Sequence, residues 1–345
     1  MTELAKKVDK MFMRYVGEVP GAAFVILKNN KILLERCYGL ADLERSIPVG
    51  SSTNFRLASV SKAFTAMCIL KLVESGKLSL EDTLYDVIPD FPKYGRTITL
   101  RYMLNHTSGI QDYKGGEVQL SDNDVLEQAK GWTQTNFTPG TKYEYSNCAY
   151  VLLGKIVEFT SGISFPRFMK NEIFTPLKMN DSILYMRGGP EIRNRAYGYL
   201  MDNGVYTLHD QSSTSALLGD GGVYTNLEDM FKWDDSLYTE KIVSYDTLRE
   251  AFTQGPIKRE DGVGYGYGWY ITSIENRKLI YHTGDTVGFR TFYFRCPEEG
   301  LSIIILTNRD SIDCFKEPIL NVDGEKDRMS ALINYFNLFS PITQT

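Results

Sequence analysis

The run from Val60 to Val73 constrains this chain more than any other segment, because it is apolar on nearly all sides and still contains Lys62. A helix that is apolar all round belongs inside a protein rather than on its surface. A buried ammonium must find hydrogen-bond partners or give up its charge, and both outcomes help it to activate a neighbouring hydroxyl. Ser59 precedes Lys62 by three residues and therefore shares its face of the expected helix. The alternative is a lysine that reaches solvent from the first helical turn.

Ser59 itself is expected at the N-terminus of this helix. Unpaired backbone N–H groups and the helix dipole favour negative charge there. An oxyanion that forms beside Ser59 could be held at this position, so Ser59 and Lys62 together read as a nucleophile with its own base.

A second motif, Tyr145-Ser146-Asn147, lies between a turn-rich segment and another apolar helix. Ser146 and Asn147 can be read as ordinary N-cap residues, and Tyr145 as a half-buried aromatic side chain. Tyr145 can act as a base only if its pKa falls from about 10. The expectation is that nearby cations, Lys62 and His282, lower it.

A third motif, His282-Thr283-Gly284, lies on an expected strand that belongs to an antiparallel meander. A glycine within a strand often marks a place where a ligand or another backbone comes close. The edge of this strand could therefore pair with a substrate amide. Taken alone, His282 is more often a satisfied strand histidine than a catalytic residue.

The order and wide spacing of the three motifs resemble the serine β-lactamase and penicillin-binding-protein superfamily, in particular its class C-like branch. That branch carries S-x-x-K, Y-x-N and K/H-x-G motifs, and it includes class C β-lactamases, DD-carboxypeptidases, D-aminopeptidases and family VIII carboxylesterases. Further segments resemble the same branch: Leu104 to Gly109, Pro139 to Thr141 and Gly219 to Thr225. The resemblance covers about residues 15 to 310.

The resemblance implies catalytic roles for Ser59, Lys62, Tyr145 and His282. Ser59 would be the acylated nucleophile and Lys62 its proton partner, while Tyr145 would serve as base or as proton shuttle to the leaving group. The resemblance also implies four substrate-binding residues: Asn147, Thr283, Gly284 and Asp285. The backbone N–H groups of Ser59 and Asp285 would form the oxyanion hole, where one donor is worth about 3 kcal/mol of transition-state stabilisation.

His282 occupies the position that is lysine in class C β-lactamases. An ammonium there is always charged, whereas an imidazole near pH 7 is charged only part of the time. We therefore expect a protonated His282 to hold a substrate carboxylate, and this departure weakens the case for a dedicated β-lactamase.

The predicted function is that of a β-lactamase-like serine hydrolase that acts through a Ser59 acyl-enzyme on amide, lactam or ester substrates. The alternative is a non-hydrolytic penicillin-binding sensor or scaffold protein on the same fold. The physiological substrate, a small molecule or a peptide, stays open because specificity lies in loops around the pocket.

Composition narrows the partners and cofactors. A net charge of -5 and a pI near 5.5, with no basic block, argue against nucleic acid. The three histidines lack metal-site spacing, so neither a metal nor another cofactor is expected, and the five cysteines are expected to be free thiols. No apolar run reaches the length of a membrane span, and the N-terminus resembles an amphipathic helix. We expect a cytoplasmic protein, or an exported one whose signal is absent from this sequence; the oligomeric state stays open.

The predicted fold class is α/β (α+β), β-lactamase-like: the resemblance implies an antiparallel sheet made from both chain ends, flanked by helices, with an inserted helical domain and the site in the cleft between them. An α/β domain is expected over 1–58 and 256–345, and a helix-rich domain over 59–255. A hairpin is expected at 22–27 and 32–37. Helices are expected near 59–75, 100–105, 122–130, 147–160, 165–173, 227–238 and 245–252.

Overall fold

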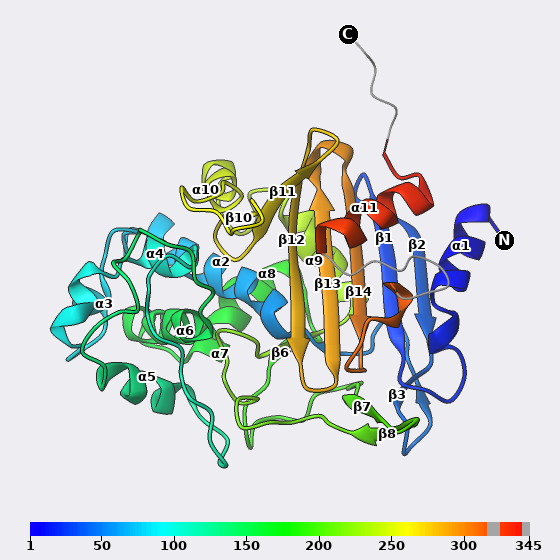
Figure 1. The fold of residues 1–345 in the computed structure, drawn as a ribbon, viewed down its shortest axis with the longest axis horizontal. Coiled ribbons are helices and arrows are strands. Elements are labelled where there is room, and N and C mark those ends of the chain that lie inside the picture. Colours follow the sequence, from blue (N-terminus) through cyan, green and yellow to red (C-terminus); the bar gives the residue numbers. More distant parts are fainter. Residues whose placement is uncertain (316–324, 340–345) are drawn as a thin grey trace, which may run out of the picture.

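The computed structural model describes residues 1–315 and 325–339 of the chain. Its central element is a seven-stranded antiparallel sheet, and its strands lie in the order β10–β11–β12–β13–β14–β1–β2 (Figure 1). The strands are β1 (Ala22–Lys28), β2 (Lys31–Tyr38), β10 (Gly264–Tyr265), β11 (Tyr270–Ile274), β12 (Arg277–Thr286), β13 (Phe289–Cys296) and β14 (Leu301–Thr307). The pairing of β1 with β14 joins the two chain ends, which confirms the expected sheet and its hairpin.

Both faces of this sheet are covered. Alternate side chains of a strand point to opposite faces, and in β1 every residue from Ala22 to Leu27 is buried. Phe24 belongs to the apolar cluster formed with α1 (Glu3–Met11) and α11 (Glu325–Phe336), whereas Val25 belongs to the cluster that includes α2 (Ser61–Glu74). The unbroken apolar run of β1 is what a strand covered on both faces requires.

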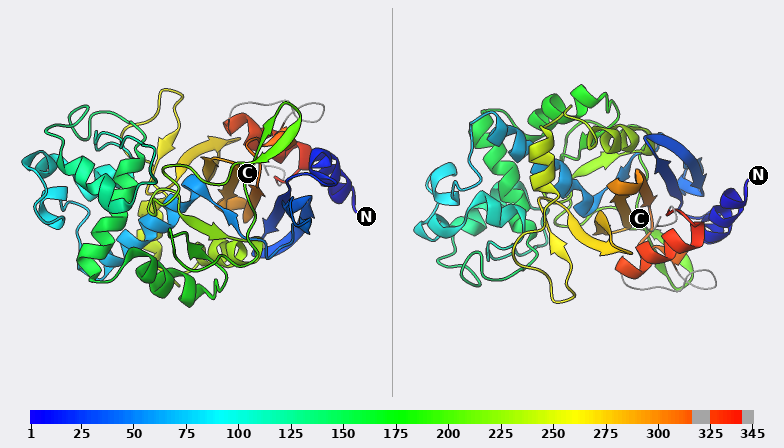
Figure 2. Two further views of the ribbon diagram at one scale, coloured as in Figure 1. Left: turned by 90° about the horizontal axis from the view of Figure 1, so that it is seen from below. Right: turned by 90° about the horizontal axis from the view of Figure 1, so that it is seen from above.

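The helix-rich part lies beside the sheet, as Figure 1 and the views in Figure 2 show. The expected helices of the middle segment are confirmed: α2, α4 (Leu100–Leu104), α5 (Asp122–Lys130), α6 (Asn147–Ser161), α7 (Phe165–Met169), α9 (Leu227–Ser236) and α10 (Tyr245–Ala251). The helix expected over 165–173 is interrupted by a π-helical stretch, Lys170–Phe174, before α8 (Thr175–Leu177).

Several short elements were not expected. They are α3 (Leu84–Val87), β3 (Leu40–Asp42), β4 (Ile47–Pro48), β5 (Phe55–Arg56), β6 (Ile183–Leu184), β7 (Tyr199–Asp202), β8 (Val205–Leu208) and β9 (Val223–Thr225). Helix α11 was not expected either. The three-stranded sheet β5–β9–β6 matters for the site, because β5 leads directly into the turn that carries Ser59.

Helix α2 is the buried helix that its composition predicts. Its side chains from Ser61 to Leu70 are almost fully excluded from solvent, Lys62 included. Phe64 stacks on Trp233 of α9, with 4.0 Å between the ring centroids and 23° between the ring planes. This aromatic pair fixes α2 against α9, at the start of the helix where Lys62 lies.

In the part of the chain that the structure describes, no single helix is long and apolar enough to cross a membrane. Helix α6 and the stretch Phe165–Leu177 satisfy that test only together, with a bend of 80° between them. The described residues contain no group of three or more potential metal-ligating side chains. All five cysteines are free thiols.

Replacing Phe64 by alanine should destabilise the protein by about 3–5 kcal/mol, because the change removes a fully buried aromatic side chain and leaves a cavity beside Trp233. Val73→Ala, at a half-buried position of the same helix, is the control and should cost about 1 kcal/mol or less. Urea unfolding followed by circular dichroism measures both. Equal losses for the two variants would contradict the role given to the Phe64 and Trp233 pair.

Candidate active site

Ser59 lies in a 3₁₀ turn, Ala58–Val60, immediately before α2. Ala58 adopts a left-handed backbone conformation with φ of 49°, which costs a non-glycine residue about 1 kcal/mol or more. Strand β12 packs against this turn: a Cβ atom at Gly284 would lie 2.1 Å from the carbonyl oxygen of Leu57. The glycine of the third motif therefore brings β12 beside the nucleophile.

The ammonium of Lys62 has three hydrogen-bond acceptors. Its Nζ atom donates to Ser59 Oγ at 3.1 Å, to Asn147 Oδ1 at 2.8 Å and to the backbone carbonyl of Asp220 at 2.9 Å. It also lies 4.8 Å from the centroid of the Tyr145 ring. The structure thus brings together the Ser59, Lys62, Tyr145 and Asn147 that the sequence singled out.

Burial is the strongest influence on this lysine. It lowers the pKa of Lys62 to about 8, although the carboxylates of Asp220 and Asp112 favour the charged form. An amine with this pKa is neutral in about a tenth of the molecules at pH 7, far more often than an ordinary lysine. Lys62 can therefore accept the proton of Ser59 near neutral pH.

Tyr145 differs from its expected state. Burial raises its pKa well above the usual value, and the neighbouring Tyr270 raises it further. The side chain of Ser59 acts in the opposite direction, but the two hydroxyls do not reach full hydrogen-bond geometry and Tyr145 Oη has no hydrogen-bond partner among the described residues. The expectation that Lys62 and His282 lower this pKa is wrong, because desolvation by burial dominates it.

Two acidic side chains that the sequence reasoning missed lie near Lys62. Asp112 accepts hydrogen bonds from the backbone N–H groups of Asn147, at 3.3 Å, and Cys148, at 2.7 Å, at the start of α6. Asp220 accepts a hydrogen bond from Tyr113 Oη at 2.9 Å. Asp220 belongs to the segment Gly219 to Thr225, one of the segments whose sequence resembles the class C-like branch. No motif in the sequence points to Asp112.

His282 is buried, and both of its ring nitrogens have partners. Nδ1 lies 2.7 Å from the carbonyl oxygen of Thr283, which can only accept, so Nδ1 carries the proton. Nε2 lies 2.8 Å from Tyr265 Oη and accepts from it. Burial, followed by the charge of Lys62, lowers the pKa of His282 to about 3.

The structure therefore does not support the expected protonated His282 that holds a substrate carboxylate. The physical reason is the same as for Tyr145: a group without solvent around it keeps its neutral form. Tyr265, the hydroxyl donor to His282, is buried at the end of β10.

The remaining predicted substrate-binding residues lie on the same strand. Thr283, Gly284 and Asp285 follow His282 along β12, which pairs with β13. Asp285 is largely exposed and forms an ion pair with Arg290 at 2.9 Å. The structure thus places all three beside the turn that carries Ser59.

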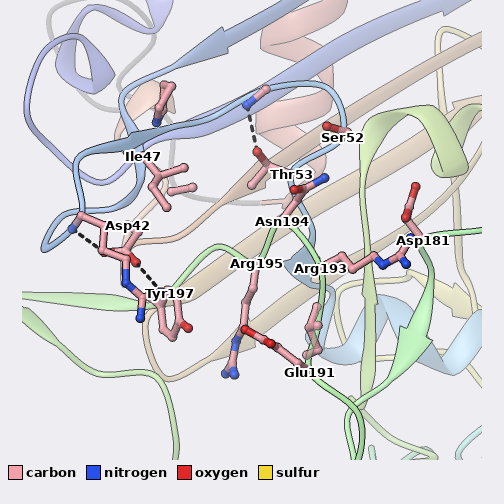
Figure 3. Close-up of a pocket in the computed structure, with 15 residues that line it drawn as sticks. Asp42, Ile47, Ser52, Thr53, Asp181, Glu191, Arg193, Asn194, Arg195 and Tyr197 are labelled. Carbon is pink, nitrogen blue, oxygen red and sulfur yellow. Dashed lines mark hydrogen bonds and ion pairs between the residues drawn. The ribbon is translucent and has the colours of Figure 1, made fainter.

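Two cavities bear on the location of the site. The larger, about 830 Å³, is lined by polar and charged side chains such as Asp42, Thr53 and Arg193 (Figure 3), and none of the four predicted catalytic residues lines it. The second, about 650 Å³, is lined in part by Tyr143, Tyr145 and the segment 257–261. Ser59 marks the candidate site, because the Ser59 hydroxyl, the buried amine of Lys62 and the amide of Asn147 converge there.

The chain combines a sheet formed by both of its ends with a serine and a buried lysine at the start of a core helix. This combination is that of a hydrolase that acts through a serine. Comparison with known proteins gives the family: residues 8–318 match the beta-lactamase family, to which the chain belongs. It is 32% identical to penicillin-binding protein 4* of Bacillus subtilis (strain 168), over 84% of this chain and 68% of the relative.

Solved structures show the same fold. The octameric penicillin-binding protein homologue from Pyrococcus abyssi aligns with a TM-score of 0.83 and 26% identity, over 97% of this chain and 77% of that one. The D-amino acid amidase from Ochrobactrum anthropi SV3, complexed with L-phenylalanine, aligns with a TM-score of 0.77 and 22% identity, over 96% and 98%.

His282 should stay neutral, with its proton on Nδ1, from about pH 5 to pH 9, because burial and Lys62 oppose its charged form. Nitrogen-15 NMR of the protein labelled at its three histidines measures this, and the urea-unfolded protein should titrate near 6.5. A His282→Asn variant assigns the signal.

The hydrogen bond between His282 and Tyr265 is tested with its own control variant. Tyr265→Phe should shift the Nε2 resonance of His282, whereas Tyr143→Phe, in the same aromatic cluster but without a bond to His282, should not. Titration of His282 between pH 5.5 and pH 8 would contradict the assigned state.

Proposed function

We propose that this protein hydrolyses amides through an acyl-enzyme on Ser59, with Lys62 as the base. The observation that carries the proposal is the buried Lys62 Nζ atom 3.1 Å from Ser59 Oγ. Ser59 Oγ forms a bond to the scissile carbonyl carbon while its proton passes to Lys62. The backbone N–H groups of Ser59 and Asp285 stabilise the oxyanion.

Tyr145 completes the acylation step as a proton donor. Because its pKa lies well above the usual value, it is protonated in the resting enzyme and cannot act as the first base. It gives its proton to the leaving nitrogen as the carbon–nitrogen bond breaks, and Lys62 returns a proton to it. Asn147 holds the ammonium of Lys62 and the amide side of the substrate, and water then releases the acid from Ser59.

We further propose that the preferred substrates carry a free amine near the scissile bond. The two carboxylates of Asp112 and Asp220 act on Lys62, and His282 beside it is neutral. In the cavity next to Tyr145, three basic side chains are matched by three acidic ones: Lys142, Lys258 and Arg259 against Glu144, Glu260 and Asp261. Two carboxylates against the single ammonium of Lys62 leave the surroundings of the nucleophile negative on balance, which favours a substrate ammonium over a carboxylate.

The rate of Ser59 acylation should rise about tenfold per pH unit up to about pH 8 and level off above it. The sign follows from Lys62, whose pKa of about 8 makes it an ammonium, unable to accept a proton, at lower pH. Labelling by a fluorescent fluorophosphonate from pH 5.5 to pH 9.5 measures this rate. Ser59→Ala is the negative control. Labelling of Ser59→Ala would show that Ser59 is not the nucleophile. A labelling rate that does not change with pH below pH 8 would show that Lys62 is not the base.

Acetylating the substrate amine should lower kcat/KM by at least about tenfold, because it removes the positive charge that the carboxylates of Asp112 and Asp220 attract. The matched substrates are D-alanine p-nitroanilide and its N-acetyl derivative, with the L-enantiomers run alongside. Asp220→Asn should reduce the difference between the pair, whereas Asp246→Asn, at an exposed position on α10, should not.

The same assay separates the hydrolase from a binding or sensor protein. A burst of one equivalent of p-nitroaniline without further turnover would favour the sensor. Faster turnover of the acetylated substrate, or of the carboxylate-bearing nitrocefin, would overturn the preference for amines while leaving the acyl-enzyme chemistry in place.

A further inference from the structure

We propose that His106 is the residue that positions Tyr145 for proton transfer, an inference that rests on the function proposed above. His106 is fully buried, and it binds the backbone on both sides of Tyr145. Its own carbonyl accepts a hydrogen bond from the N–H of Glu144 at 2.9 Å, and its ring Nδ1 accepts one from the N–H of Ser146 at 3.2 Å. Its ring also lies against that of Tyr145, with 4.2 Å between the centroids.

These contacts need the neutral form of His106 with its proton on Nε2. A backbone N–H can only donate, so Nδ1 must keep its lone pair to accept from Ser146. The aromatic rings of Tyr145, Tyr150 and Tyr265 surround the imidazole. Burial, and then the charge of Lys62, keep the pKa of His106 well below its usual value.

Tyr145 depends on such anchors because its hydroxyl has no hydrogen-bond partner among the described residues. The position of the Tyr145 side chain is set by the hydrogen bonds of the backbone beside it and by the rings that contact it. His106 provides contacts of both kinds. The chain makes this possible through a left-handed turn at His106, with φ of 59°. Asparagine tolerates that conformation better than most residues do, which decides the choice of test variants.

The test compares two amide side chains at this position. His106→Asn places an acceptor near where Nδ1 lies and tolerates the left-handed turn. His106→Gln places its amide one bond farther out and has no acceptor at the δ position. We expect His106→Asn to keep kcat for the D-alanine anilide within about threefold of wild type, and His106→Gln to lower it at least about tenfold with KM changed by less than about twofold.

A double-mutant cycle with Tyr145→Phe separates positioning from general destabilisation. If His106 acts through the Tyr145 hydroxyl, His106→Gln should add little to the loss caused by Tyr145→Phe alone. Circular dichroism and thermal unfolding check that every variant is folded at the assay temperature.

The possible outcomes distinguish a failure of this inference from a failure of the proposed function. If Tyr145→Phe alone leaves kcat unchanged, the proposed proton transfer is wrong. If Tyr145→Phe is slow but His106→Gln is as fast as wild type, or if the two losses multiply, the proton transfer stands and the positioning role of His106 is overturned. Equal losses for the Asn and Gln variants would likewise assign His106 a packing role alone.

Discussion

The rest of the site depends on one buried ion, the ammonium of Lys62. Taking an ammonium out of water costs several kcal/mol, which only complete hydrogen bonding offsets. Its three donors go to three separate segments: the turn at Ser59, the first residue of α6 at Asn147, and the loop before β9 at Asp220. A shift of any one segment would leave a buried charge unsatisfied, so the lysine fixes their relative positions as well as the nucleophile.

Desolvation by burial is the largest influence on the pKa values of Lys62, Tyr145 and His282. It lowers the pKa of Lys62 to about 8 and that of His282 to about 3, and it raises that of Tyr145 well above its usual value. Of these three groups, only Lys62 changes charge near neutral pH. The motifs alone suggest a tyrosinate between two cations; the environment produces a neutral tyrosine, a neutral histidine and a lysine poised to act as base.

The sequence predicted what depends on local pattern and missed what depends on distant loops. Apolar periodicity placed the helices of the middle segment and the β12–β13–β14 meander, and the spacing of Ser59 and Lys62 placed them on one face. Asp112, Asp220 and Tyr265 reach the site only through tertiary contacts, such as the Tyr265 to His282 bond between β10 and β12, which no short window contains. The division at residues 59 and 255 into two domains stays a prediction.

Glycines determine how closely the sheet approaches the nucleophile. A Cβ atom at Gly284 would meet the carbonyl of Leu57 at 2.1 Å, and one at Gly268 would meet the carbonyl of Lys62 at 2.9 Å. Because both obstacles are backbone atoms, no change of side-chain rotamer could make room for a larger residue. The floor of the site is thus set by backbone contacts between β12, the β10–β11 turn and α2. Differences in substrate preference then depend on side chains that loops carry, such as the carboxylates of Asp112 and Asp220 that act on Lys62.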